Sequence, residues 1–230
     1  FELGHIVKDG LRRMYGENSE NIYYYLTVYN EPYVHPAEPE NLDVEGLLKG
    51  IYLYSPASKK HKKNAQILAS GVGVNWALKA QQLLADDWGV KASVWSVTSW
   101  NELRRDGLEA DRHNLLNPKD KRTAYVTKKL KGARGPVIAV SDYMRAVQDQ
   151  ISPWVEQPFY SLGTDGFGLS DTRGALRRHF NVDAESIAIA VLQQLCNQGD
   201  IKQSIVTKAM DKYRIHDVSA ADAGNTEGSG

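Results

Sequence analysis

Cysteine is almost absent from this chain, which has a single one, Cys196, among 230 residues. No intramolecular disulfide can form, and such a composition is typical of proteins from reducing compartments. The sequence also lacks an apolar run long enough to span a bilayer, and no segment has the pattern of a signal peptide. These absences predict a cytoplasmic protein that has no membrane partner.

The chain also lacks a net charge, since Lys and Arg together number 28 and Asp and Glu together number 28. This balance argues against nucleic acid as the main partner. The six histidines include no i, i+4 pair and none stands near the cysteine, so we expect no metal site. The Gly-x-Ser-x-Gly pattern of serine hydrolases is missing as well.

The stretch 64–99 is predicted to form a strand, a turn, a helix and a second strand, and the rest of the chain extends or covers the resulting sheet. Residues 65–70 form a short apolar run, which is typical of a strand covered on both faces. Gly71 and Gly73 then supply a tight turn, and apolar residues recur at helical spacing until Gly89 ends the helix. Residues 90–97 are rich in β-branched residues and indicate a second strand. A helix between two such strands implies a parallel pair with a right-handed crossover.

Further strands and helices are predicted on both sides of this unit. Strands are expected at 22–28, 136–141 and 159–162, and a helical turn followed by a strand at 42–54. Helices are expected at 1–16, from Ser99 with Glu102 in a capping box, at 121–131, from Asp142, from Ser170 or Asp171, from Asp183, and from Asp200 with Gln203. The charged stretch 104–117 is expected to be irregular. Strands that alternate with helices predict an α/β layered domain around a mostly parallel sheet.

Three segments mark possible boundaries of the folded unit. The polar, basic segment SPASKKHKKN at 55–64 is where we place a domain boundary. From Asp217 onward the chain has no apolar pattern, which predicts a disordered tail. The chain begins within an amphipathic helix at Phe1, so we expect a C-terminal fragment of a longer polypeptide.

Three other segments could bind an anion, and each also has a simpler explanation. The turn at 70–74 invites a dinucleotide-binding interpretation, but Trp76 stands where the Gly-x-Gly-x-x-Gly fingerprint needs its third glycine, so a plain turn is favoured. The basic run at 59–63 could contact phosphate, although a solvated linker is favoured. The loop GTDGFGLSD at 163–171 could hold an anion, although a turn and a helix cap explain its composition.

His35 is the catalytic candidate that the residues themselves suggest. It lies in an extended, proline-stiffened loop after a predicted strand, near Glu31 and Tyr33. Catalytic groups favour such loops, and histidine acts as an acid or a base near neutral pH. Loop histidines without a catalytic role are more common, so both alternatives stay open at this point.

Four segments resemble the homodimeric bacterial pyruvate dehydrogenases, and their sequences are similar to those of actinobacterial members. They are IYYYLTVYNEPYVHPAEP, SVWSVTSWNELRRDGLEADRHNLLNP, VIAVSDYMRAVQDQISPWV and SLGTDGFGLSDTRGALRRHFNVDAESI. The resemblance implies a three-layer α/β domain at 56–216 with a mostly parallel, mixed sheet flanked by helices, like the transketolase C-terminal domain. It also implies that residues 1–55 are the end of a second α/β domain, the pyrimidine-binding domain, and that 217–230 form a tail.

The resemblance further implies an activity and partners. These enzymes use thiamine diphosphate and magnesium, bound between two subunits, to decarboxylate pyruvate and acetylate the lipoyl group of the dihydrolipoyl acetyltransferase component. The family motif Gly-Asp-Gly is not in this chain, because Lys8, Arg105 and Thr164 precede its Asp-Gly pairs. We therefore expect the cofactors to be held mainly by the rest of the same polypeptide and a second subunit, and the chain alone to be inactive.

Two site residues follow from the resemblance. In the family, a histidine in the loop after the YYY strand commonly follows a tyrosine directly. Here Val34 follows Tyr33, and the histidine is His35, one position further on. His35 is assigned as the catalytic residue, which would stabilise a developing alkoxide or move protons, and Tyr33 as a substrate-binding neighbour. The alternative is a non-catalytic dimerisation or interaction domain of the same complex.

Overall fold

A five-stranded sheet forms the centre of the computed structural model, which describes residues 1–58 and 61–221. The strands are β1 (Tyr52–Ser55), β2 (Lys63–Ala69), β3 (Val90–Ser96), β4 (Val137–Val140) and β5 (Phe159–Leu162). Their order across the sheet is β1-β3-β2-β4-β5. β1 is antiparallel to β3, whereas β3 with β2, β2 with β4 and β4 with β5 are parallel. The predicted α/β class with a mostly parallel, mixed sheet is confirmed.

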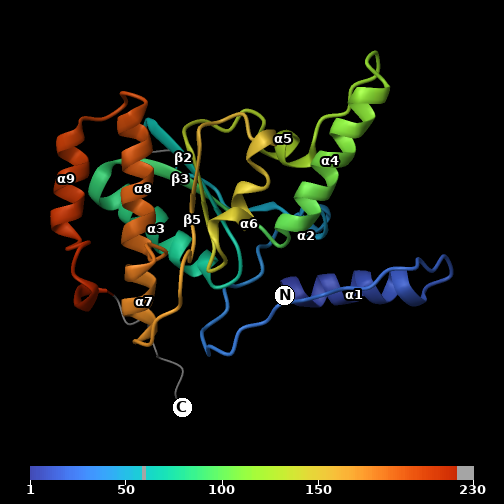
Figure 1. Ribbon diagram of the computed structural model, residues 1–230, viewed down its shortest axis with the longest axis horizontal. Helices are drawn as coiled ribbons and strands as arrows, with labels where there is room; N and C mark the ends of the chain where they lie inside the picture. Colours follow the sequence, from blue (N-terminus) through green and yellow to red (C-terminus); the bar gives the residue numbers. More distant parts are fainter. Residues whose placement is uncertain (59–60, 222–230) are drawn as a thin grey trace.

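The β2–α3–β3 unit forms as its apolar pattern predicts. Helix α3 (Gly73–Trp88) ends at Gly89, whose φ of 63° lies in the left-handed region that glycine adopts without strain. β2 and β3 pair in parallel, with Ala65 opposite Ala92. Both strands are largely buried, because helices cover the two faces of the sheet (Figure 1).

Each face of the sheet carries its own apolar core. On one face, α3 packs with α8 (Ala184–Asn197) and α9 (Gln203–Lys212). On the other lie α4 (Trp100–Leu116), α5 (Tyr125–Leu130) and α6 (Arg145–Asp149). From β2 the chain therefore crosses one face through α3, and from β4 it crosses the opposite face through α6. These two neighbouring strands form the topological switch point of the sheet.

Helix α4 is longer than expected. Its cap forms as predicted, because the Ser99 hydroxyl accepts from the Glu102 backbone N–H at 3.1 Å. The prediction that 104–117 is irregular was wrong, since the helix continues to Leu116. Its charged residues lie on the solvent side, while small or apolar residues recur every three or four positions on the buried side. These buried residues are Trp100, Leu103, Gly107 and Ala110.

Of the four other helix N-caps that were predicted, one forms and three do not. Asp183 caps α8 by accepting from the Ser186 N–H at 2.9 Å, as predicted. The predicted caps that do not form are Asp142, Ser170 or Asp171, and Asp200 with Gln203. Instead α6 starts after Met144, Thr172 caps α7 (Arg173–His179), and α9 has no side-chain cap. At α7, Ser170, Asp171 and Thr172 have similar capping propensities, so tertiary contacts decide which of them caps the helix.

The remaining elements are short. Helix α2 (Val44–Leu48) precedes β1 as predicted, and the 3₁₀ turn η1 (Ser152–Trp154) follows α6. The prediction of disorder from residue 217 is corrected at its start, where Asp217 caps the 3₁₀ turn η2 (Val218–Ala220); residues 222–230 lie outside the described residues. Within the described ranges, no helix combines the length and apolar character needed to cross a membrane.

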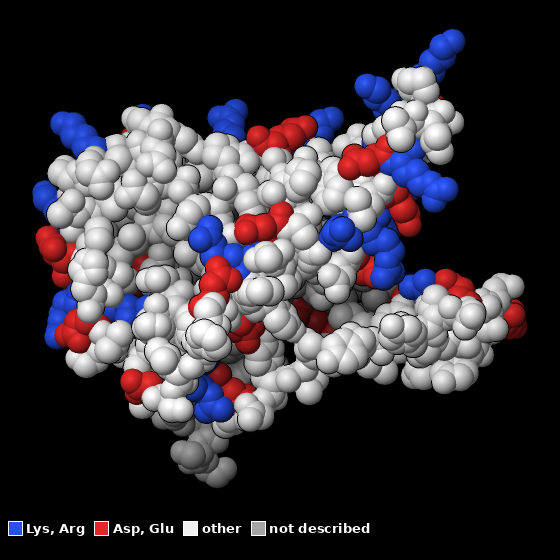
Figure 2. All heavy atoms as spheres, in the orientation of Figure 1, with Lys and Arg blue, Asp and Glu red and all other residues white. Residues whose placement is uncertain are grey.

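An arm, residues 1–40, extends from the sheet and begins with α1 (Glu2–Tyr15) (Figure 1). The predicted strand at 22–28 is wrong: this segment pairs with no strand in the part of the chain that the structure describes. A strand needs a neighbouring strand to satisfy its backbone hydrogen bonds, and none of the described strands lies beside this segment. Tyr23 and Tyr25 are consequently 87% and 84% exposed. Figure 2 shows much of the arm as uncharged surface, whereas Lys, Arg, Asp and Glu are interspersed over the visible face of the body.

Candidate functional site

The two predicted site residues lie together where the arm returns to the sheet. The rings of Tyr33 and His35 stack with centroids 4.6 Å apart and an interplanar angle of 27°. Alternate residues of an extended chain point to the same side. Val34, between them, points away and is 80% exposed. The one-residue displacement of His35 therefore places its ring on the Tyr33 side of the loop.

A cavity of about 560 Å³, here named the arm cavity, has both rings in its wall. It lies between the start of α1, the segment 25–36 and the loops that follow β2 and β3. The sheet side contributes hydroxyl and amide groups from Ser70, Asn75, Thr98, Ser99 and Asn101. A volume of this size suits a small-molecule site.

Glu2 attaches the arm to the edge of the sheet. Its Oε1 accepts hydrogen bonds from the Tyr52 and Ser96 hydroxyls, both at 2.6 Å. Burial, and then the hydrogen bond to Glu2, raises the pKa of Tyr52. Burial also raises the pKa of Tyr33, with a further contribution from the charges of Glu2 and Glu31. Both phenols are protonated at neutral pH, and that of Tyr52 donates its hydrogen bond to Glu2.

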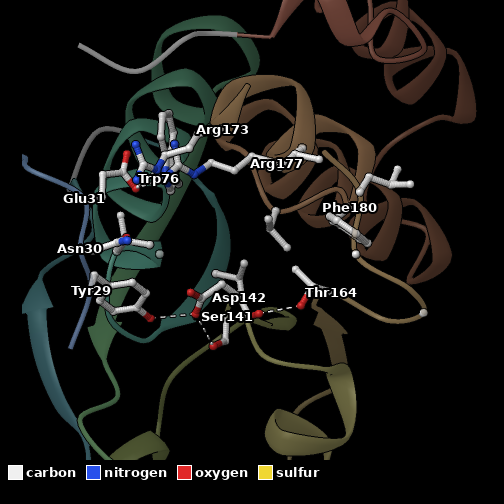
Figure 3. Close-up of a pocket in the computed structure, with 18 residues that line it drawn as sticks. Tyr29, Asn30, Glu31, Trp76, Ser141, Asp142, Thr164, Arg173, Arg177 and Phe180 are labelled. Atoms are coloured by element: carbon white, nitrogen blue, oxygen red, sulfur yellow. Dashed lines mark hydrogen bonds and ion pairs between the residues drawn. The ribbon is translucent and has the colours of Figure 1, made fainter. Parts of the chain in front are cut away.

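A second cavity, of about 510 Å³, lies at the carboxyl ends of β2, β4 and β5 (Figure 3). We name it the switch-point cavity. On one side the Tyr29 hydroxyl donates to Asp142 Oδ1 at 2.8 Å, and the Thr164 hydroxyl donates to the Asp142 carbonyl at 2.6 Å. Burial, and then the hydrogen bond to Asp142, raises the pKa of Tyr29. These bonds hold the arm against the loops that follow β4 and β5.

The other side of the switch-point cavity carries two arginines from α7 (Figure 3). Arg177 pairs with Glu31 of the arm, and its guanidinium lies 4.8 Å from the ring centroid of Trp76. Arg173 Nε lies 3.6 Å from the same Glu31 oxygen. Two guanidinium groups thus share one carboxylate.

The described residues do not fit thiamine diphosphate and its magnesium. No group of three or more His, Cys, Asp or Glu side chains in the described ranges is arranged to hold a metal ion. The glycine turn after β2 is also covered, because a Cβ on Gly71 would lie 2.3 Å from the Tyr29 hydroxyl. A diphosphate cannot approach this turn closely, which supports the plain strand-to-helix interpretation over a dinucleotide site.

The sequence analysis missed the contacts that build the switch-point cavity. Arg177 and Glu31 are 146 residues apart, and Tyr29 and Asp142 are 113 residues apart, so no local pattern connects them. The one available signal was the glycine-rich loop at 163–171, part of which lines this cavity. The predicted basic run lies partly outside the described residues, at 59–60, and its last lysine begins β2.

The family model of the transketolase-like TK C-terminal domain matches residues 50–183. The chain belongs to this family. A second family model, of the pyruvate dehydrogenase E1 component middle domain, matches residues 1–36. The arm and the sheet therefore match two different domains.

The resemblance to pyruvate dehydrogenases is confirmed by curated relatives. The pyruvate dehydrogenase E1 component of Mycolicibacterium smegmatis is 60% identical over 222 residues, which is 96% of this chain and 24% of the relative. That of Mycobacterium tuberculosis is 55% identical over 228 residues, 99% of this chain and 24% of the relative. The chain thus spans about a quarter of these relatives. Among solved structures, transketolase from Leishmania mexicana gives a TM-score of 0.45 at 18% identity, over 69% of this chain and 20% of that one.

Proposed function

We propose that this chain is part of a thiamine diphosphate- and magnesium-dependent, cytoplasmic pyruvate dehydrogenase (acetyl-transferring). Such an enzyme decarboxylates pyruvate and acetylates the lipoyl group of a dihydrolipoyl acetyltransferase component. The proposal rests on the 60% identity to an E1 component over 96% of the chain. We assign residues 1–55 to the end of the pyrimidine-binding domain, 56–216 to the C-terminal domain and 217–230 to the tail. β1 (Tyr52–Ser55) lies wholly on the 1–55 side of the first boundary, yet it pairs with β3 at the edge of the sheet.

The exposed apolar side chains of the arm support a site that other polypeptide completes. On α1, Leu3, Val7 and Leu11 are 46%, 46% and 53% exposed. Together with the tyrosines of the following segment they make an apolar surface that is costly to leave in water, at about 25 cal/mol per Å². We infer that the rest of the same polypeptide covers this surface in a homodimer. The same surface favours the second candidate, a dimerisation or interaction domain without a catalytic role.

Within this proposal the chain supplies an active-site loop and leaves the cofactors to polypeptide outside it. His35, in the wall of the arm cavity, binds or releases a proton at the substrate oxygen on which negative charge develops. The stacked Tyr33 ring restricts the orientation of the imidazole and provides a neighbouring wall for substrate. The C-terminal domain supports this loop through Ser96, which donates to Glu2, and through Asp142, which accepts from Tyr29.

Substitution of His35 in the complete polypeptide tests the proposal. Because a positioned acid or base contributes about 10²–10⁴-fold, His35→Ala is expected to lower kcat by about 100-fold or more. The melting temperature is expected to stay within about 2 °C, because the side chain is exposed and has few contacts to lose.

His61→Ala serves as the matched control, because His61 belongs to the wall of neither cavity. Unchanged kinetics in His35→Ala together with a lowered melting temperature would favour the dimerisation or interaction domain.

A further inference from the structure

The switch-point cavity has the position and size of a ligand site that the proposed function does not use. It opens where the chain leaves β2 and β4 toward opposite faces of the sheet. In open α/β sheets, ligands bind outside the carboxyl ends of the strands at this point. Its volume of about 510 Å³ is also in the range of small-molecule sites.

The charges on the α7 side of this cavity are not balanced. Arg173 and Arg177 carry two positive charges, and Glu31 supplies the carboxylate that both approach. The Arg177 side chain is only 12% exposed: it pairs with Glu31 through Nη2 and lies over the Trp76 ring, while its Nη1 is buried without a hydrogen-bond partner in the described ranges. This side of the cavity therefore keeps an excess positive charge.

Arg173 is the residue that is placed to contact an anionic ligand. Its side chain is 53% exposed, and its Nε stays 3.6 Å from Glu31, beyond hydrogen-bond distance. Its guanidinium donates no hydrogen bond to another residue within the described ranges. A planar guanidinium with available donors binds a carboxylate or phosphate through paired hydrogen bonds.

The rest of the wall restricts the ligand to one orientation. Apolar and aromatic side chains line the middle of the cavity: Val72, Leu169, Leu176, Phe180 and Val182. Asp142 on the far side, with the hydroxyls of Tyr29 and Thr164 bonded to it, disfavours a negative group there. An anionic group therefore belongs on the Arg173 side, with an apolar body behind it (Figure 3).

We propose that the switch-point cavity binds a small organic anion, a carboxylate or a phosphate ester, whose charged group contacts Arg173 and whose apolar or aromatic body contacts the walls near Leu176 and Phe180. Tyr29 and Glu31 line both cavities, but His35 lines the arm cavity and does not line the switch-point cavity. It does not depend on the reaction proposed above.

Calorimetric titration of the full chain with phenyl phosphate and with benzoate tests this site, and phenol is the neutral probe. We expect saturable binding of at least one anion, and their ratio distinguishes phosphate from carboxylate. Arg173→Ala should weaken it by about tenfold or more, because a charged hydrogen-bond donor is lost. Glu31→Gln should strengthen it several-fold, because the competing internal carboxylate is removed.

Two variants with matched chemistry serve as controls. Arg105→Ala removes an arginine that is 66% exposed and that, among the described residues, pairs only with Glu102. Glu45→Gln removes an exposed carboxylate that pairs with Lys49. Both should leave the affinity unchanged. The proposal is overturned if neither anion binds at concentrations up to about 20 mM, if phenol binds as tightly, or if Arg173→Ala and Arg105→Ala behave alike. A weakened affinity in Glu31→Gln, with an unchanged melting temperature, would also overturn it.

Discussion

Replacement of Arg178 by alanine tests how the C-terminal helices are joined to one another. The Arg178 side chain is 1% exposed and pairs with Asp183, which is 5% exposed. It also lies 3.4 Å from Glu185 and donates to the Tyr213 and Arg214 carbonyls at 3.2 and 3.3 Å. One guanidinium thus connects the end of α7, the start of α8 and the end of α9.

The expected cost follows from this burial. Removal of one member of a buried ion pair typically costs about 3–5 kcal/mol, because the remaining charge loses its partner. Asp183 still accepts from the Ser186 N–H at 2.9 Å, which partly satisfies it. We therefore expect Arg178→Ala to lower the free energy of unfolding by about 3 kcal/mol. For a domain of this size, that corresponds to a melting temperature about 6–12 °C lower.

Urea unfolding followed by circular dichroism measures this change directly. The matched control is Arg105→Ala, whose exposed pair with Glu102 should contribute less than about 1 kcal/mol. A loss below about 1 kcal/mol for Arg178→Ala would show that the three helices are held together by their apolar contacts alone. That result would refute the role assigned to Arg178.

Two further predictions concern a turn and a surface ion pair. Gly71→Ala should lower the free energy of unfolding by about 1–3 kcal/mol, because φ is +56° and the new Cβ would lie 2.3 Å from the Tyr29 hydroxyl. Thermal unfolding measures this loss, and Gly168→Ala, with nothing within 4 Å of the added Cβ, is the control; equal losses would contradict the reasoning. The hydrogen bond from Lys212 holds the pKa of Asp87 below its ordinary value of 3.8. The contact therefore stabilises the fold above pH 3.8 and is lost as the pH falls through the folded-state pKa. Asp87→Asn should flatten the acid side of a stability–pH curve, and an unchanged acid side would exclude this contribution.

The parts of the fold with local signals were predictable from the sequence. The β2–α3–β3 unit has an apolar run, a helical period and a terminal Gly89, each of which acts over a few residues. The caps at Ser99 and Asp183 are local for the same reason, since each side chain bonds a backbone N–H three residues further on. The resemblance then added the family, which spacing alone could not reveal.

The parts that depend on distant residues were not predictable. Residues 22–28 have strand propensity, but a strand also needs a partner strand, and none lies beside this segment in the described ranges. The continuation of α4 depends on burial of its small face, which the charged residues of the stretch concealed. The switch-point cavity depends on Glu31 meeting Arg177 across 146 residues. Only the folded chain brings these groups together.

Calorimetric titration of thiamine diphosphate, in the presence of magnesium, tests most directly whether the cofactors are held outside this chain. The titration is run on the 230-residue chain and on the complete polypeptide in parallel. We expect saturable binding by the complete polypeptide and no heat of binding by the chain alone. Tight binding by the chain alone would contradict the assignment of this fold to a supporting role.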